Sequence, residues 1–235
     1  LAISSEVPSG ILTTTGDIVY ATSANTPARL GIGASGTILH GGTIPSYSKV
    51  TAADIVTGTT TMMKIGEVTG TGTTGVIEFA SIVSSFRALE LHIYGRATGA
   101  GGPLGLRLTF ETSPTSGAYD SQHVIGLATA VSAGENTGGS DFITVNVAWP
   151  GTSVTQAGFA GSSTIRIPCY SDTAYMKTVH FSSAGTNTGA TTSMLYYMNG
   201  VGWWESTAAI NYLRLTLASG NFETGVKASL WGLPS

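Results

Sequence analysis

The chain has 235 residues, of which 42% are hydrophobic and only 10% are charged. The hydrophobic share is large enough for a core, and the charged share is well below the roughly 25% of typical soluble proteins. With 32 glycines and many threonines, the composition favours strands and turns over helices. The formal net charge is −3 and the cations are scattered singly, which argues against nucleic acid as a partner because no basic face would neutralise phosphates. The low charge also suits a subunit whose surface is largely covered by neighbouring subunits.

Cysteine content and hydropathy narrow the class of protein further. Cys169 is the only cysteine, which excludes an intrachain disulfide and a Cys-based zinc site. Because it follows Pro168 in a strand-like run, we expect it to be a small buried hydrophobe. No apolar run approaches the roughly 18–20 residues needed to span a bilayer, and the chain does not start with a secretion signal. We therefore expect no membrane insertion.

Residues 1–75 are predicted to form an extended anchoring arm and linker. Ser, Thr, Gly, Ala and Pro dominate, and apolar residues come in short clusters, such as Ile18–Tyr20, between Gly or Pro. Such a segment cannot bury enough apolar surface to offset its chain entropy. We therefore expect a partner to order it, either sister subunits or another protein. Within it, residues 50–55 are the best candidate for a short helix, and the Gly/Thr-rich residues 69–75 are predicted to be a flexible linker.

From Val76 onward the sequence predicts a series of β-strands. Apolar and polar residues alternate most clearly in Leu89–Tyr94 and Leu104–Phe110, the period of a strand with one buried face. Gly-rich breaks between strands are predicted at 98–103, 134–139, 158–163 and 183–189. The predicted strands are Val76–Ala80, Phe86–Tyr94, Leu104–Glu111, Gln122–Val131, Phe142–Ala148, Thr164–Tyr170, Tyr175–Ser183, Ser193–Asn199, Ile210–Leu217 and Val226–Leu233.

The last two predicted strands form a hairpin that needs a second sheet. Leu213, Leu215 and Leu217 alternate with polar residues, as do the apolar residues of 226–230, and Gly220 lies in the connection. A hairpin alone is marginal in water, so its apolar face must be covered. Many strands without intervening helices predict an antiparallel β-sandwich, and the eight-stranded jelly roll is the leading architecture of that class. We predict that residues 76–235 form one jelly-roll β-sandwich domain.

Two stretches of the sequence resemble structural proteins of tailed-bacteriophage virions. The first contains Gly16-Asp-Ile-Val-Tyr-Ala21 and Ala28-Arg-Leu-Gly-Ile-Gly33, followed by Pro45 and Tyr47. It looks like the Gly-Asp-x-x-Tyr-Ala … Arg-Leu-x-Ile-Gly motif of tail-fibre and other appendage proteins. The second runs from Ser206 to Gly232 and is similar to the closing hairpin of small jelly-roll domains in phage structural proteins.

The resemblance implies a non-enzymatic subunit, usually a homotrimer, with an extended N-terminal anchor and a C-terminal knob. Only one copy of the first motif is present, where fibres often carry several, and Tyr47 stands where a Trp is frequent. These departures favour a short arm over a long fibre shaft.

Motifs for catalysis, cofactors or metals lack the context that their chemistry requires. Gly31–Gly36 matches the G-x-G-x-x-G pattern of dinucleotide-binding loops, but no helix follows to receive a phosphate, so we interpret it as a Gly-rich turn. The four histidines share no ligand-type spacing, and acidic residues near the loops are isolated. No nucleophile elbow or catalytic carboxylate pair is recognisable. We therefore expect no catalytic, cofactor-binding or metal-binding residue.

Aromatic residues near the C-terminal strands are the candidates for a binding surface. Exposed Trp and Tyr rings stack on sugar rings, which would give a glycan-binding knob. Alternatively, one member of each adjacent pair fills the core while the other packs against a neighbouring subunit. The candidate residues for glycan or subunit contact are Tyr196, Tyr197, Trp203, Trp204 and Trp231.

Together these features favour a structural protein on the virion surface, assembled in the host cytoplasm. The expected partners are sister copies in a homotrimer, other capsid or tail proteins held through residues 1–75, and a host-surface glycan. The leading hypothesis is a short tail or head fibre that serves in host attachment. A capsid decoration protein that clamps neighbouring capsid subunits is the alternative, and a polysaccharide-degrading spike is a third hypothesis.

Overall fold

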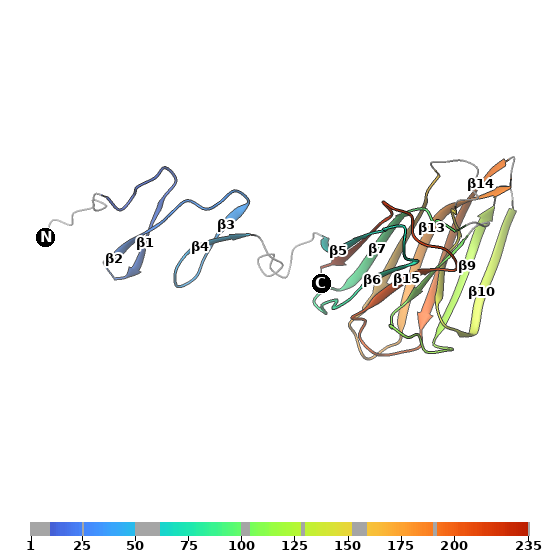
Figure 1. Cartoon of the computed structure of the whole chain (residues 1–235). Helices are drawn as coiled ribbons and strands as arrows, with labels where there is room; N and C mark the ends of the chain where they lie inside the picture. Colours follow the sequence, from blue (N-terminus) through green and yellow to red (C-terminus); the bar gives the residue numbers. More distant parts are fainter. Residues whose placement is uncertain are drawn as a thin grey trace. The chain divides into compact units, whose positions relative to one another are not determined.

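The chain divides into two compact units, Leu1–Thr59 and Thr60–Ser235. The computed structural model describes residues 10–24, 26–49, 62–99, 104–127, 130–151, 159–189 and 192–234. Throughout these ranges every regular element is a β-strand and all strand pairs are antiparallel (Figure 1). The predicted short helix at 50–55 lies outside the described residues.

The described part of the first unit consists of two small hairpins. β1 (Ile18–Ser23) pairs with β2 (Thr26–Leu30), and β3 (Thr37–His40) pairs with β4 (Ser46–Lys49). None of the described residues between 10 and 49 is buried. Ile32 and Ile44, for example, are 64% and 58% exposed.

The second unit is a sandwich of two sheets. The larger sheet has eight strands in the order β10-β9-β14-β13-β12-β7-β16-β5, and the smaller has four in the order β11-β8-β15-β6. The strands are β5 (Met63–Thr69), β6 (Val76–Phe79), β7 (Ala88–Gly95), β8 (Leu104–Thr109), β9 (Tyr119–Leu127), β10 (Ala130–Ser140), β11 (Ile143–Trp149), β12 (Gly161–Pro168), β13 (Lys177–Gly189), β14 (Thr192–Trp204), β15 (Leu213–Leu217) and β16 (Lys227–Leu233).

The strand order is that of a jelly roll with two extra hairpins. Without β9, β10, β13 and β14, the sheets read β5-β16-β7-β12 and β6-β15-β8-β11. If the eight remaining strands are numbered along the chain, the first sheet has the order 1-8-3-6 and the second the order 2-7-4-5. This is the strand order of an eight-stranded jelly roll. The hairpins β9–β10 and β13–β14 extend only the larger sheet, beyond β12. The predicted fold class is therefore confirmed, and the extra hairpins are an addition to it.

Alternating apolar side chains from both sheets form the core. In β15, Leu213, Leu215 and Leu217 are buried while Arg214 and Thr216 are only half-buried. In β7 the buried positions are Leu89, Leu91 and Ile93. The period of two in the sequence thus assigned the faces of these strands correctly.

The boundary between the units lies earlier than the sequence predicted. β5 (Met63–Thr69) pairs with β16 in the larger sheet, and Ile65 and Val68 pack against the core. The predicted linker at 69–75 is also tied to the domain: Gly70 N–H donates to Val226 O at 2.7 Å, and Leu217 N–H donates to Gly75 O at 3.0 Å. The sandwich therefore includes residues 63–75. In residues 69–75 backbone hydrogen bonds hold the segment, and its small side chains give no sign in the sequence that it belongs to the domain.

Several predicted breaks are strand residues instead. Residues 134–139 lie in β10, 183–189 lie in β13, and 161–163 begin β12. Conversely, the strand predicted at Gln122–Val131 is the end of β9 and the start of β10, which pair with each other. Glycine here does not mark turns, because long hairpins with many partners tolerate residues that lack a side chain to pack.

Cys169 differs from its predicted role. It is exposed and has a positive φ of 47° in the turn after β12, whereas its neighbour Tyr170 is buried. The strand ends at Pro168, so the alternation that would have placed the thiol inside does not extend to it.

Candidate functional site

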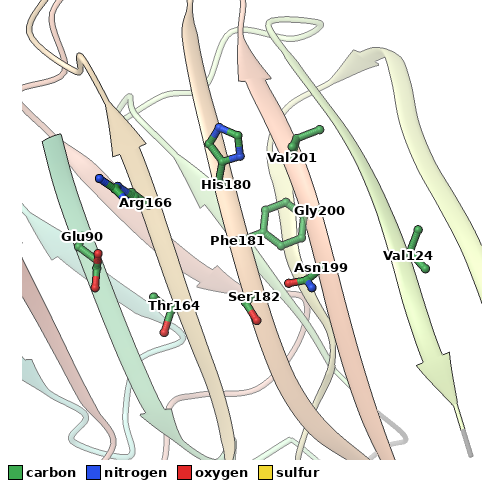
Figure 2. A pocket seen from close by; sticks show the side chains of 10 residues that line it. All are labelled: Glu90, Val124, Thr164, Arg166, His180, Phe181, Ser182, Asn199, Gly200 and Val201. Carbon is green, nitrogen blue, oxygen red and sulfur yellow. The ribbon is translucent and has the colours of Figure 1, made fainter.

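The outer face of the larger sheet carries a groove lined by polar side chains together with apolar ones, among them Val124 and Val201. Its volume is about 540 Å³. On β12 the pattern of burial alternates strictly, so that Ser162, Thr164 and Arg166 point outward while Ile165 and Ile167 enter the core. Figure 2 shows the lining side chains rising from β7, β12, β13, β14 and β9.

Side-chain size along the register explains the hollow. Thr164 on β12 pairs with Ser182 on β13, so the two middle strands carry small outward groups at this level. In the next register row Ser162 pairs with Ala184, and Tyr94 and Tyr197 lie on either side of that pair, beside the residues that line the groove. Neighbouring strands lie about 4.8 Å apart, so the walls on β7 and β14 stand roughly 14 Å from each other.

One end of the groove holds its charged side chains. Arg166 lies across from Glu90 on one side and from His180 on the other. The Glu90 carboxylate is turned toward His92, with Oε1 2.8 Å from Nε2. Among the described residues, Arg166 forms no ion pair and no hydrogen bond through its guanidinium. The charge left without a partner in the groove is therefore positive.

A second, smaller hollow lies beside the groove and has acidic walls. It has a volume of about 200 Å³ and is lined by Asp120 and Gln122 of β9, Glu135 of β10 and Trp203 of β14, among others. Its carboxylates separate it chemically from the Arg166 end of the groove.

The aromatic residues singled out in the sequence fall on different faces. Tyr197 and Trp203 are 54% and 55% exposed on the outer face, whereas Trp204 is 4% exposed and belongs to the core. Tyr196 and Trp231 are half-buried. Trp231 lies across from Glu90, on β16, with Lys64 of β5 on its other side. The structure therefore does not gather the five into one patch.

Sequence reasoning missed the polar lining of the groove. Arg166, His180 and Asn199 come from three strands that are adjacent only through long-range pairing. Their outward position follows from the alternation of each strand. Their meeting in one groove depends on the register between strands, for which the sequence alone carries no signal.

The buried titratable groups away from the groove serve the fold. Lys177 is buried and its ammonium donates to Tyr175 O at 2.8 Å and Thr207 O at 3.0 Å; burial lowers the pKa of this group. Burial raises the pKa of Tyr119, whose hydroxyl oxygen accepts from Phe110 N–H at 3.0 Å. Both residues fasten loops to strand ends.

Neither a metal centre nor a membrane-spanning helix is found where the structure is described. Within those ranges no three or more His, Cys, Asp or Glu side chains are placed to share a metal ion. The same ranges contain no helix that is long and apolar enough to cross a bilayer.

Comparison with known proteins identifies no relative. No protein family matches the chain, and neither does any curated protein or solved structure.

Proposed function

We propose that the protein is a non-enzymatic structural subunit on the surface of a tailed-phage virion, where it serves as a short fibre in host attachment. The N-terminal unit anchors it to another virion protein, and the jelly-roll domain forms the exposed knob of a homotrimer. The proposal combines the sequence resemblance with one structural observation, the contrast between a first unit none of whose described residues is buried and a second unit with an extensive core.

The N-terminal unit supports an anchoring role because its apolar side chains have no cover. No described residue of this unit is buried, and Leu12, Ile32, Leu39 and Ile44 are all exposed. Two-stranded hairpins are marginally stable by themselves, so these exposed apolar groups are available for contact with a partner. A partner surface that covers these groups would supply the missing burial.

The jelly-roll domain supports the role of a self-sufficient knob. Its core includes large, fully buried side chains from both sheets, among them Tyr119 and Trp149. Such a domain keeps its shape when held at the end of an arm, and its larger sheet offers a broad outer face to solvent or to sister subunits.

Antibody labelling of intact particles tests this proposal. Particles of the phage that encodes the chain are incubated with a gold-labelled antibody raised against the jelly-roll domain and imaged by electron microscopy. We expect label on the tail or at a head fibre, and trimers of the purified full chain in analytical ultracentrifugation. Label spread evenly over the capsid would indicate a capsid decoration protein instead of a fibre. Absence of the chain from purified particles would overturn the proposal.

A matched pair of variants tests the anchor. Ile32→Asp with Ile44→Asp introduces charges where apolar contacts are expected, and should abolish incorporation into particles. Thr22→Asp with Ser48→Asp adds the same charge to the same unit at exposed polar positions, and should incorporate normally. Equal incorporation of both pairs would show that the apolar groups are not the anchor.

A further inference from the structure

The groove on the outer face has the shape of a site for an extended ligand. Thr164 of β12 and Ser182 of β13 form its floor, between Glu90 on the β7 side and Asn199 and Val201 on the β14 side. Its floor residues Thr164 and Ser182 are themselves exposed, so the groove is shallow. A shallow channel over a flat sheet accommodates a chain lying across it better than a compact molecule, which needs an enclosing pocket.

The lining chemistry matches hydroxyl-rich ligands. Thr164 and Ser182 offer hydroxyl groups, Asn199 an amide and His180 an imidazole, each of which donates or accepts hydrogen bonds. Tyr94 and Tyr197 stand exposed on the outer face in the register row beside the groove, and their rings combine an apolar face with a polar edge. Sugar rings present the same combination of apolar faces and hydroxyl edges.

The backbone of the floor argues against a peptide ligand. An extended peptide usually gains affinity by adding a strand to a free sheet edge. β12 is paired with β7 and β13, and β13 is paired with β12 and β14. The groove therefore lies over the middle of the sheet, where no backbone edge is free.

The charge of the groove points to an anionic ligand. Arg166 is without an ionic partner among the described residues, because the Glu90 carboxylate is directed to His92 at 2.8 Å. A guanidinium binds a carboxylate or a phosphate through two parallel hydrogen bonds. A single such cation in a chain of net charge −3 is too little for a nucleic acid backbone, but it suits one anionic group on an otherwise neutral chain.

We propose that this groove binds an anionic glycan, with Arg166 and His180 at the acidic group and Thr164, Ser182 and Asn199 at the hydroxyl groups. Tyr94 and Tyr197 flank the sugar rings. This inference rests on the proposed function, for which it names the ligand of the knob. The anionic group is a carboxylate or a phosphate, since the guanidinium recognises both.

Binding of the purified full chain to an immobilised glycan panel tests the inference. The panel contains carboxylated chains (oligogalacturonides and sialylated oligosaccharides), phosphorylated chains (mannose-phosphate oligosaccharides) and neutral chains (maltooligosaccharides and oligomannose). We expect binding to carboxylated or phosphorylated chains, which identifies the acidic group, and weakening of that binding by added salt. Binding to neutral chains only, or to none, would overturn the inference.

Variants at two arginines that have no acidic partner among the described residues provide the matched control. Arg166→Met should weaken anionic glycan binding by about 10-fold or more, because it removes a charge-assisted bidentate contact. Arg87→Met removes the same charge from an exposed arginine that does not line the groove, and should leave affinity within about 2-fold, the effect of net charge alone. Equal effects of the two changes would show that only net charge matters.

Two further variants act on the groove in opposite directions. Ser182→Trp fills the floor from an exposed position and should abolish binding, while Glu90→Gln removes the nearby negative charge and should strengthen it. Unchanged binding by both would place the ligand elsewhere. Failure of these tests leaves the virion labelling experiment unaffected, because that experiment reads the location of the chain and requires no ligand.

Discussion

Among single residues, the adjacent tryptophans Trp203 and Trp204 illustrate how alternation divides neighbours between core and surface. Trp204 is buried, with its ring 5.5 Å from that of Phe110 and stacked on Tyr119 at 6.4 Å, whereas Trp203 points outward. This division agrees with one half of the alternative considered from the sequence, in which one of each pair enters the core. The contact of Trp203 with a neighbouring subunit stays a prediction.

Replacing each tryptophan by alanine should therefore give very different losses of stability. Trp204→Ala creates a cavity among aromatic rings and should lower the free energy of unfolding by about 3–5 kcal/mol. Trp203→Ala removes an exposed ring and should change it by less than about 1 kcal/mol. Denaturant unfolding of the two variants measures both quantities, and comparable losses would contradict the assigned faces.

Asp17 is the residue that holds the first hairpin to the turn before it. Its carboxylate accepts N–H groups of Thr13 at 2.9 Å and Thr14 at 2.8 Å, and it lies 3.2 Å from Arg29. Burial by itself raises the pKa of Asp17, but the backbone hydrogen bonds, the Thr14 hydroxyl and Arg29 outweigh it and lower the pKa to about 2.

The lowered pKa of Asp17 predicts the pH range over which this turn holds. The group binds its proton more weakly in the folded hairpin than in the unfolded chain, so its stabilising effect is complete above about pH 4 and is lost as the pH falls through about 2. A carbon-detected NMR titration of the full chain should place the Asp17 midpoint near pH 2. A midpoint near the ordinary value of 3.8 would show that the turn is not formed.

Among the elements, β14 packs close to the facing sheet because glycine interrupts its inner face. A Cβ added to Gly202 would lie 2.6 Å from Cγ2 of Ile143 on β11, well inside normal contact. A Cβ added to Gly126 of β9 would meet nothing nearer than 3.8 Å. The absence of a side chain at 202 thus sets the spacing between the sheets.

Alanine substitutions at these two glycines should separate crowding from backbone effects. Gly202→Ala should lower the free energy of unfolding by about 1–3 kcal/mol, because Ile143 is fully buried and cannot move aside. Gly126→Ala should be neutral within about 0.5 kcal/mol or slightly stabilising. Thermal unfolding of both variants gives the comparison, and an unaffected Gly202→Ala would mean that the sheets separate easily.

The strands also show which parts of the structure could be predicted from the sequence. Strands with strict alternation, such as β7, β12 and β15, were predicted at nearly their true positions because one face is fully buried. β10 and the far half of β13 were missed, since their small and polar residues resemble turns and their pairing depends on neighbours. The groove was missed for the same reason, because it exists only once β7, β12, β13 and β14 are in register.

At the scale of the whole molecule, the division after Thr59 makes two truncations informative. A chain that begins at Thr60 keeps β5 and should unfold cooperatively with its strand content intact. A chain that begins at Val76 loses β5, exposes the edge of β16, and leaves Val226 O and Phe222 N–H without their partners at Gly70 and Thr74. Exposed edges promote aggregation.

We expect the Val76 truncation to unfold at clearly lower denaturant concentration than the Thr60 truncation, or to aggregate. Circular dichroism and light scattering at matched concentrations measure the two outcomes. Equal stability of both truncations would restore the boundary at residue 76 that composition alone suggested. The low side-chain content of 69–75 explains why composition was a poor guide there: the segment is held by its backbone.

The strand order of the larger sheet implies a direction in which the fold could have grown. β9–β10 lies outside β13–β14 in that sheet, so within the sheet the outer hairpin pairs only with the inner one, while Ser121 and Asn136 also contact Thr144 of the facing β11. Ile143 lies opposite Leu108, so β8 and β11 would remain a simple hairpin if everything between them were replaced by a short turn. An ancestor without the outer hairpin thus keeps an unbroken ladder in the larger sheet, whereas one without the inner hairpin has a gap between β12 and β9. Lineages of this architecture should therefore have gained β13–β14 before β9–β10. A protein engineer who shortens the fold should remove β9–β10 first.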